Sequence, residues 1–211
     1  MRQTHRRSPL QRMFTEITYG NDVRRLALKH ALRMCESSYR QGRSFYSYKG
    51  QRGNNDETAF LGKIAEILFE EYLLAAGVSI KEGPLGDLAY DKPESNFNGD
   101  YSVLTPSGVK RIELKTKSIN CRPLPSYEVG TTRISAADFF VFSRLNDYNG
   151  VLYLCGGLSR ADFKAAASYR PKGIQVKNSA QSSFLSLGNE YLVKISELDT
   201  IDKLIKLWLP H

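Results

Sequence analysis

Three charged side chains near the middle of the chain have types and a spacing that suit metal-dependent chemistry. Asp100 stands before a run of strand-forming residues, and Glu113 and Lys115 lie in a second such run. Residues 105–108, Thr-Pro-Ser-Gly, separate the two runs, and proline in the second turn position with glycine in the fourth favours a tight turn. We therefore expect a β-hairpin that brings the two runs side by side.

The register of this hairpin follows from the two-residue turn, because opposed positions in an antiparallel pair keep a constant sum. Asp100 falls opposite Glu113 on one face of the sheet, and strand alternation puts Lys115 on the same face. Ile112 and Leu114 then point the other way, toward a core. The same register sets two further cross-strand pairs: Leu104 with Val109, and Ser102 with Arg111.

Two opposed carboxylates repel each other unless a cation lies between them, so this arrangement favours a divalent metal ion. The carboxylates of Asp100 and Glu113, together with the Leu114 carbonyl oxygen, are hard donors of the kind that Mg²⁺ and Mn²⁺ prefer. The competing interpretation is a surface hairpin whose acids are neutralised by neighbouring arginine and lysine side chains.

The strongest helical pattern in the chain covers residues 58–76, with capping residues before it and Gly77 after it. Its apolar residues recur at helical spacing, and Lys63, Glu66 and Glu70 are expected on the opposite side. Glu66 borders the apolar stripe, which suits a residue that leans toward a site at the sheet edge. Glu70 is expected to be solvated.

Asp100 followed by Glu113-Leu114-Lys115 resembles the signature of the PD-(D/E)XK nuclease superfamily, with Gly99 where that family often has proline. The resemblance implies a Mg²⁺-dependent endonuclease that hydrolyses DNA phosphodiester bonds, with Mn²⁺ as a substitute. The metal would polarise the phosphodiester and activate water. Lys115 would orient that water or stabilise the charge that develops on the phosphate.

Within this resemblance, Glu66 corresponds to the additional acid that the first core helix of the family often supplies. The order of elements over residues 58–168 also resembles the α-β-β-β-α-β core of the family, although the second helix is only faintly present near residues 134–137. We therefore expect an α/β fold with a mixed central β-sheet flanked by helices and a restriction-endonuclease-like core. The implied catalytic residues are Glu66, Asp100, Glu113 and Lys115, and the implied metal ligands are Asp100, Glu113, Leu114 and Glu66.

The net charge of +8 is concentrated near the N-terminus. Residues 1–57 contain twelve basic and five acidic side chains, so we expect a basic, mainly helical N-terminal extension followed by a nuclease-like domain over residues 58–211. This surplus favours a polyanionic partner, with DNA as the first expectation. The alternative function is a non-catalytic nucleic-acid-binding protein that uses this basic region.

Residues 39–53 interleave aromatic, cationic and glycine residues without a period. Aromatic rings stack on bases and cations contact phosphates, so the run is predicted to bind nucleic acid. An ordinary surface loop whose tyrosines rest on the core is the alternative. The predicted nucleic-acid contacts are Arg40, Arg43, Tyr46, Tyr48, Lys49, Arg52 and Lys117.

The three cysteines, Cys35, Cys121 and Cys155, lack the close spacing of a structural zinc site and are odd in number. A reducing, cytoplasmic compartment is therefore expected. No apolar window approaches the ~20 residues of a membrane span, so no membrane association is expected.

Periodicity predicts several further elements. They are a mobile basic arm over residues 1–20, a helix over 22–38, a strand over 77–82, buried strands over 138–145 and 151–155, a helix over 160–168, a strand over 191–195 and a C-terminal helix from residue 196. The apolar stripe of that last helix is expected to pack in the core, with a homodimer contact as the alternative.

Overall fold

The computed structural model describes residues 14–40, 55–83, 100–119, 126–131, 134–177, 183–185 and 189–209. Its helices are α1 (Asn21–Arg40), α2 (Asn55–Ala75), α3 (Arg160–Ala166) and α4 (Ile201–Trp208), with a 3-10 turn, η3 (Ile195–Glu197). The strands of the main sheet are β1 (Thr15–Thr18), β2 (Ser79–Glu82), β3 (Tyr101–Thr105), β4 (Gly108–Ser118), β6 (Phe139–Asn146) and β7 (Val151–Ser159). The remaining strands are β5 (Ser126–Gly130), β8 (Ser168–Arg170), β9 (Gln175–Lys177), β10 (Ser183–Leu185) and β11 (Glu190–Lys194).

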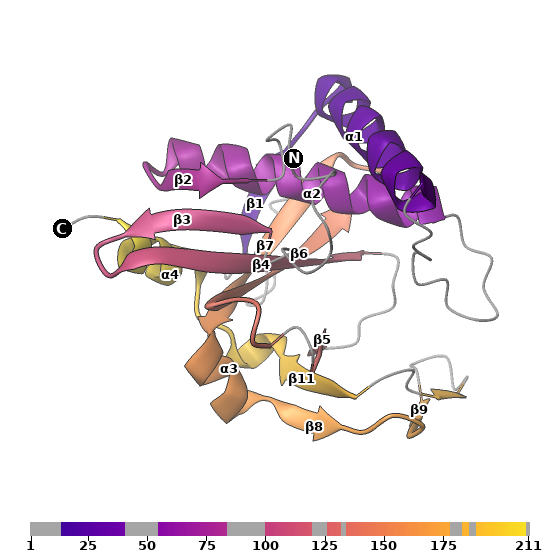
Figure 1. Ribbon diagram of the computed structural model, residues 1–211, viewed down its shortest axis with the longest axis vertical. Coiled ribbons are helices and arrows are strands. Elements are labelled where there is room, and N and C mark those ends of the chain that lie inside the picture. The colour runs from indigo at the N-terminus through magenta and orange to yellow at the C-terminus, as the bar shows by residue number, and fades with distance from the viewer. Residues whose placement is uncertain are drawn as a thin grey trace, which may run out of the picture.

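The main sheet has six strands in the order β1-β7-β6-β4-β3-β2, and it is mixed (Figure 1). Strands β2, β3 and β4 form an antiparallel meander, whereas β4 and β6 are parallel. Strand β6 then pairs antiparallel with β7, and β7 pairs with β1. A mixed sheet flanked by helices was expected from the sequence, and this part of the prediction is confirmed.

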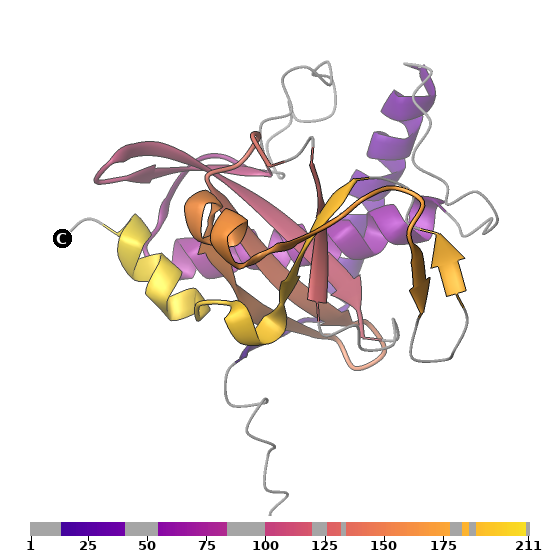
Figure 2. The ribbon, with the colours of Figure 1, turned by 90° about the horizontal axis from the view of Figure 1, so that it is seen from below.

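Two apolar cores lie on opposite faces of this sheet. Helices α2 and α4 cover one face, where Ile112 and Leu114 of β4 are buried. Helix α3 and the three-stranded sheet β5-β11-β8 cover part of the other face, where Phe140 and Phe142 of β6 are buried against Phe163 of α3 (Figure 2). Successive residues of a strand point to opposite faces, so β4 and β6 each contribute to both layers.

The expected hairpin is confirmed in both position and register. Strand β3 ends at Thr105, β4 begins at Gly108, and the two predicted cross-strand pairs are present. They are Leu104 with Val109 and Ser102 with Arg111. Gly108 has a φ of +98°, a left-handed conformation that glycine adopts without strain.

The expected helices over 22–38, 58–76 and 160–168 are confirmed as α1, α2 and α3, with small changes in their ends. Gly77 follows α2 with a φ of +82°, as a C-terminal cap requires. The Ser159 hydroxyl accepts a hydrogen bond from the Asp162 N–H and caps α3. The predicted division of the chain after residue 57 stays a prediction, and it falls within the first turn of α2.

Three expectations need correction. Within the predicted mobile arm, Thr15–Thr18 form β1, because the otherwise free edge of β7 offers backbone hydrogen bonds to them. Strand β7 extends to Ser159, four residues beyond the predicted end at residue 155. The C-terminal helix starts at Ile201, where Thr200 accepts a hydrogen bond from the Lys203 N–H and caps it.

The connection between β4 and β6 contains β5 and a turn at residues 134–136, and its described part has no helix. The faint helical pattern there is therefore too weak to form one. In the C-terminal helix, Ile201, Leu204, Ile205 and Trp208 are buried in the core, as expected for this apolar stripe. None of the helices in the described ranges is long and apolar enough to cross a membrane.

The segment before α4 approaches β7 closely at two glycines. Gly157 and Asp199 exchange backbone hydrogen bonds of 2.9 and 3.0 Å. Gly156 has a φ of +118°, and a Cβ atom on it would fall on the Asp199 carbonyl oxygen, far inside van der Waals contact. Glycine is therefore required there for both its conformation and its lack of a side chain.

We expect the substitution Gly156→Ala to lower the free energy of unfolding by at least about 3 kcal/mol, because it adds a backbone clash to left-handed strain. Gly173→Ala is the matched control, because Gly173 has a φ of +85° but a Cβ atom on it would meet no other atom within 4 Å. Its expected cost is about 1 kcal/mol, from the conformation alone. Urea unfolding of both variants measures the difference, and equal costs would contradict the close approach of the segment before α4.

Candidate functional site

Asp100 lies directly before β3, at the point where β3 and β4 separate. Its N–H donates to the Ile112 carbonyl at 2.8 Å, and its Oδ2 accepts the Leu114 N–H at 2.7 Å. The Asp100 side chain therefore accepts a hydrogen bond from the Leu114 N–H of β4, which lies just beyond the last paired residues of β3 and β4. This bond fixes the carboxylate against the middle of β4.

Glu113 and Lys115 lie on the face of β4 opposite to the buried Ile112 and Leu114. The Glu113 residue is only 2% exposed, and its Oε1 pairs with the Lys115 ammonium group. A buried carboxylate is costly unless it is paired, so this contact offsets part of the cost of removing Glu113 from water. The expectation that these two side chains share a face is confirmed.

Helix α2 adds charged groups to the same region. The Tyr101 hydroxyl donates to the backbone carbonyl of Glu66 at 2.6 Å, which links α2 to the first residue of β3. The Glu66 carboxylate pairs with the Lys63 ammonium group through Oε2. Both side chains are largely buried, with 17% and 10% of their surfaces exposed, respectively.

The sequence interpretation of α2 was wrong for two residues. Lys63 was expected on the exposed side, but it is buried, with 8% of its surface exposed. Glu70 was expected to be solvated, but it is half-buried. Burial of the Tyr101 hydroxyl raises its pKa, and the charges of nearby acids, Glu70 among them, raise it further. The sequence placed residues 63, 66 and 70 together on one side of the helix, but this side is more buried than expected.

Burial and neighbouring charges shift the pKa of Asp100. Removal of its carboxyl group from water raises this pKa to about 8, and the charges of Glu113 and Glu66 act in the same direction. Lys115 and the Leu114 N–H act in the opposite direction. The residue keeps some surface exposure, so the burial concerns the carboxyl group more than the whole residue. Asp100 therefore interacts electrostatically with each of the other three implied catalytic residues, Glu66, Glu113 and Lys115.

In the described part of the chain, no group of three or more His, Cys, Asp or Glu side chains is arranged to hold a metal ion. The carboxylates of Glu66 and Glu113 instead pair with lysine ammonium groups. Hard oxygen donors of the kind that a divalent cation prefers are nevertheless present in the Asp100 and Glu113 carboxylates and in the Leu114 carbonyl group.

The predicted nucleic-acid contacts are mostly not described. Arg43, Tyr46, Tyr48, Lys49 and Arg52 lie outside the described residues. Arg40 is the last residue of α1, and its side chain is not described. Lys117 lies two residues after Lys115 on the same face of β4, and its ammonium group is 5.4 Å from the centre of the Tyr127 ring.

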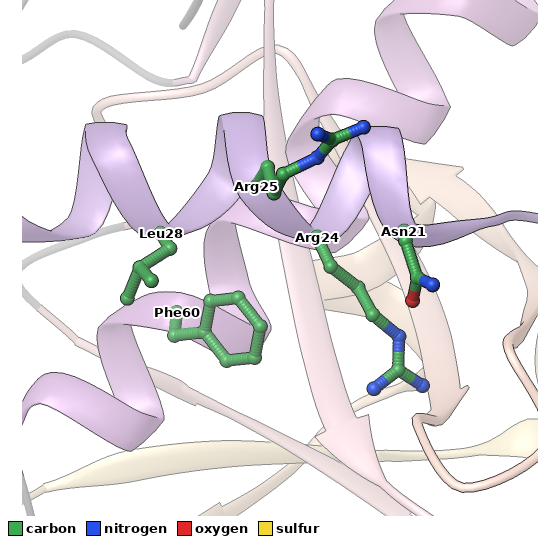
Figure 3. Close-up of a pocket in the computed structure, with 5 residues that line it drawn as sticks. All are labelled: Asn21, Arg24, Arg25, Leu28 and Phe60. Carbon is green, nitrogen blue, oxygen red and sulfur yellow. The ribbon is translucent and has the colours of Figure 1, made fainter.

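A cavity of about 520 Å³ lies between α1 and α2, and none of the four implied catalytic residues lines it. Figure 3 shows Leu28 and Phe60 next to each other there, whereas the side chains of Arg24 and Arg25 extend in different directions. Arg24 is held by Asp147, with 3.0 Å between its Nη2 atom and Oδ1 of the carboxylate. This contact ties α1 to the turn between β6 and β7.

The raised pKa of Asp100 predicts a pH-dependent stability when divalent metals are absent. The folded state binds the proton up to about pH 8, whereas the unfolded chain releases it near the ordinary value of 3.8, so stability falls as pH rises between these values. We expect Asp100→Asn, which keeps an acceptor for Leu114 N–H, to remove this loss. Its advantage over the unmodified chain should grow by up to about 1.4 kcal/mol per pH unit from pH 4 to 8.

Urea unfolding in EDTA across this pH range measures the effect. Asp22→Asn, which removes one carboxylate from the exposed start of α1, is the control for a simple change of net charge. Parallel stability curves for the unmodified chain and Asp100→Asn would contradict the burial of a repelled carboxyl group at this position.

The site is therefore built from two parts of the chain that are distant in sequence. The hairpin supplies Asp100, Glu113 and Lys115, and α2 supplies Glu66 and Lys63. Comparisons of the chain with protein-family models, with curated proteins and with solved structures found no match.

Proposed function

We propose that the protein is a Mg²⁺-dependent endonuclease that hydrolyses DNA phosphodiester bonds. The observation that carries this proposal is the convergence of Asp100, Glu113 and Lys115 at the start of β3, with Glu66 supplied by α2. Burial raises the pKa of Asp100 to about 8, and repulsion by the neighbouring acids contributes to this rise. A divalent cation would relieve that repulsion.

Asp100 and Glu113 would hold the metal ion, with the Leu114 carbonyl oxygen as a third donor. When bound, such an ion polarises a phosphodiester and lowers the pKa of water. Asp100 is already held in place by the Leu114 N–H, so its carboxylate needs little reorganisation to bind. Mn²⁺ has similar ligand preferences and is expected to substitute.

Lys115 would act on the reacting groups from the same face of β4. Its ammonium group pairs with Glu113, and 32% of its side-chain surface is exposed, so it faces both the acids and the solvent from which a substrate arrives. In this position it can hold a water molecule for attack or stabilise negative charge on the phosphate. Glu66 contributes a further carboxylate from α2, and its direct partner is Lys63.

The order of elements supports the restriction-endonuclease-like interpretation. Helix α2 precedes the antiparallel strands β2, β3 and β4, and β6 then pairs parallel to β4. The resembled family core has the same first helix and three strands, and its fourth strand follows a second helix. The departure is the connection from β4 to β6, which contains β5 where the family core has its second helix.

DNA is proposed as the substrate because of the charge distribution. Most of the surplus positive charge belongs to residues 1–57, and the exposed residues Arg25 and Lys29 of α1 are part of it. Lys115 and Lys117 place two further cations on the site face of β4. Cations on these surfaces are suited to contact the phosphates of a nucleic acid.

A second candidate is a nucleic-acid-binding protein without catalytic activity. The observation that favours it is that Glu113 and Glu66 already have lysine partners. Such pairs neutralise the acids without a metal ion. Dependence of cleavage on a divalent metal separates the two candidates, because only the first requires it.

We expect the variants Asp100→Asn, Glu113→Gln and Lys115→Met each to lower the rate of DNA cleavage by about 10²–10⁴-fold, the range for loss of a positioned catalytic group. These changes preserve side-chain size, so the fold should be retained. Single-turnover cleavage of plasmid DNA, with Mg²⁺ and with EDTA, measures the effect.

Glu71→Gln is the matched control for this experiment. Glu71 is an exposed acid of α2, one residue beyond the half-buried Glu70, and its replacement should leave cleavage unchanged. Cleavage at a normal rate by a folded Glu113→Gln or Lys115→Met variant would exclude that residue from the reaction. Absence of Mg²⁺-dependent cleavage on duplex, single-stranded and branched DNA would favour the non-catalytic candidate.

Residues 1–57 are expected to set nucleic-acid affinity without taking part in the chemical step. We expect the triple variant Arg43→Ala, Lys49→Ala and Arg52→Ala to flatten the log–log salt dependence of duplex binding by about two to three units, since each phosphate contact contributes about 0.9. Single-turnover cleavage at saturating protein should stay near normal. An unchanged salt slope would mean that these cations do not contact phosphates.

A further inference from the structure

The cavity between α1 and α2 has no part in the proposed chemistry, although its volume of about 520 Å³ is that of a small-molecule site. Its apolar walls are Leu28 of α1 and Phe60 of α2, which lie next to each other (Figure 3). Leu28 is 50% exposed, and Phe60 is partly buried. An aromatic ring beside an aliphatic side chain gives a flat apolar group a surface on which to stack.

The cations at this cavity differ in their surroundings. Arg24 is held by the Asp147 carboxylate at 3.0 Å and also donates to the Asp147 backbone carbonyl, so its charge already has a partner. The Arg25 side chain is exposed, and Lys29 is exposed one turn further along the same side of α1. The interior of the cavity therefore suits an uncharged apolar group, whereas its rim suits an anion.

A nucleotide within a nucleic acid combines these two properties, because it has a flat base and an anionic phosphate. The base would stack on Phe60 and contact Leu28. The Asn21 side-chain amide also lines the cavity, and it has both a donor and an acceptor for a base edge. Arg25 would contact the phosphate. A base inside a duplex is paired and stacked between its neighbours, so the cavity would accept only an unpaired base.

Helix α2 connects this cavity to the proposed site. Phe60 comes six residues before Glu66 in α2, so about 9 Å along the helix axis separates them. The Glu66 backbone carbonyl accepts the Tyr101 hydroxyl at 2.6 Å, and Tyr101 directly follows Asp100. A strand bound at Asp100 would therefore reach the cavity within a few nucleotides.

An acidic protein segment with an apolar side chain is the other occupant that this surface would accept, because Leu32 extends the exposed apolar stripe of α1 beyond Leu28. Two observations favour nucleic acid. The cavity shares α2 with the proposed site, and Arg25 and Lys29 belong to the surplus of positive charge in residues 1–57.

We propose that the cavity between α1 and α2 binds an unpaired nucleotide, so that the protein prefers DNA with an unpaired base to fully paired DNA. This inference rests on the proposed function for the identity of DNA as the partner. The contacts involved require neither a metal ion nor cleavage, so they can be measured by binding alone.

Three DNA duplexes of equal length test this proposal. One is fully paired, one has a single unpaired nucleotide, and one has an abasic unit in place of that nucleotide, which keeps the phosphate but removes the base. Fluorescence anisotropy in EDTA, which prevents metal-dependent cleavage, gives the dissociation constants. We expect the unmodified protein to bind the DNA with the unpaired base about 5- to 100-fold more tightly than the abasic DNA, the range for one stacked base.

The variants test each part of the cavity. Phe60→Leu keeps an apolar side chain but removes the aromatic face, so it should bring the ratio of the two dissociation constants close to one, whereas Phe60→Tyr should retain the ratio. Leu28→Ser should lower it. Leu74→Ser is the matched control, because Leu74 is a similarly exposed leucine of α2, and this variant should leave the ratio unchanged. Arg25→Gln should weaken the binding of both DNAs equally, because both retain the phosphate.

The outcomes separate this inference from the proposed function. Equal affinity of the unmodified protein for the unpaired and abasic DNAs would overturn the inference, leave a metal-dependent nuclease intact and favour an acidic protein segment as the occupant. An unchanged ratio in a folded Phe60→Leu variant would do the same, and Leu28→Ser serves this purpose if Phe60→Leu fails to fold. Absence of binding to all three DNAs would overturn the proposed DNA substrate, and the inference with it.

Discussion

The hydrogen bond from the Leu114 N–H to the Asp100 carboxylate is the contact on which the geometry of the site depends. It lies just beyond the last pair of the β3–β4 ladder, where a main-chain donor of β4 would otherwise need a different acceptor. Because the acceptor of this bond is a side chain, the bond holds the carboxylate of Asp100 against β4, as main-chain hydrogen bonds hold the strands together. Glu113 and Lys115 then follow from the alternation of β4, whose other face is buried under α2.

The two faces of β4 have opposite requirements, and this constraint explains the arrangement of the layers. Ile112 and Leu114 need an apolar cover, which α2 and α4 provide. The charge of the buried Glu113 needs a partner, which Lys115 supplies while keeping access to solvent. The small sheet β5-β11-β8 and α3 cover Phe140 and Phe142 of the adjacent β6, and Lys115 keeps a third of its side chain exposed beside them.

Much of this arrangement was predictable from sequence, because it depends on local rules. The turn at residues 105–108 fixes the hairpin register, and the register puts Glu113 and Lys115 on one face. Strand β1 was missed because its four residues have no distinctive pattern and are defined by their pairing with β7, which is distant in sequence. The capping of α4 by Thr200 was also missed, since η3 and the contact of Asp199 with β7 interrupt the apolar periodicity before it.

The burial of Lys63 could not be predicted from the apolar pattern, and the reason is physical. A helical pattern assigns charged residues to the exposed side because an unpaired buried charge is costly, but that cost falls when a partner is supplied. Here the partner is Glu66, and the neighbouring hairpin excludes water from one turn of α2 through Tyr101. Paired in this way, Lys63 and Glu66 can both lie largely inside the protein, at a position where the apolar pattern alone predicts exposure to solvent.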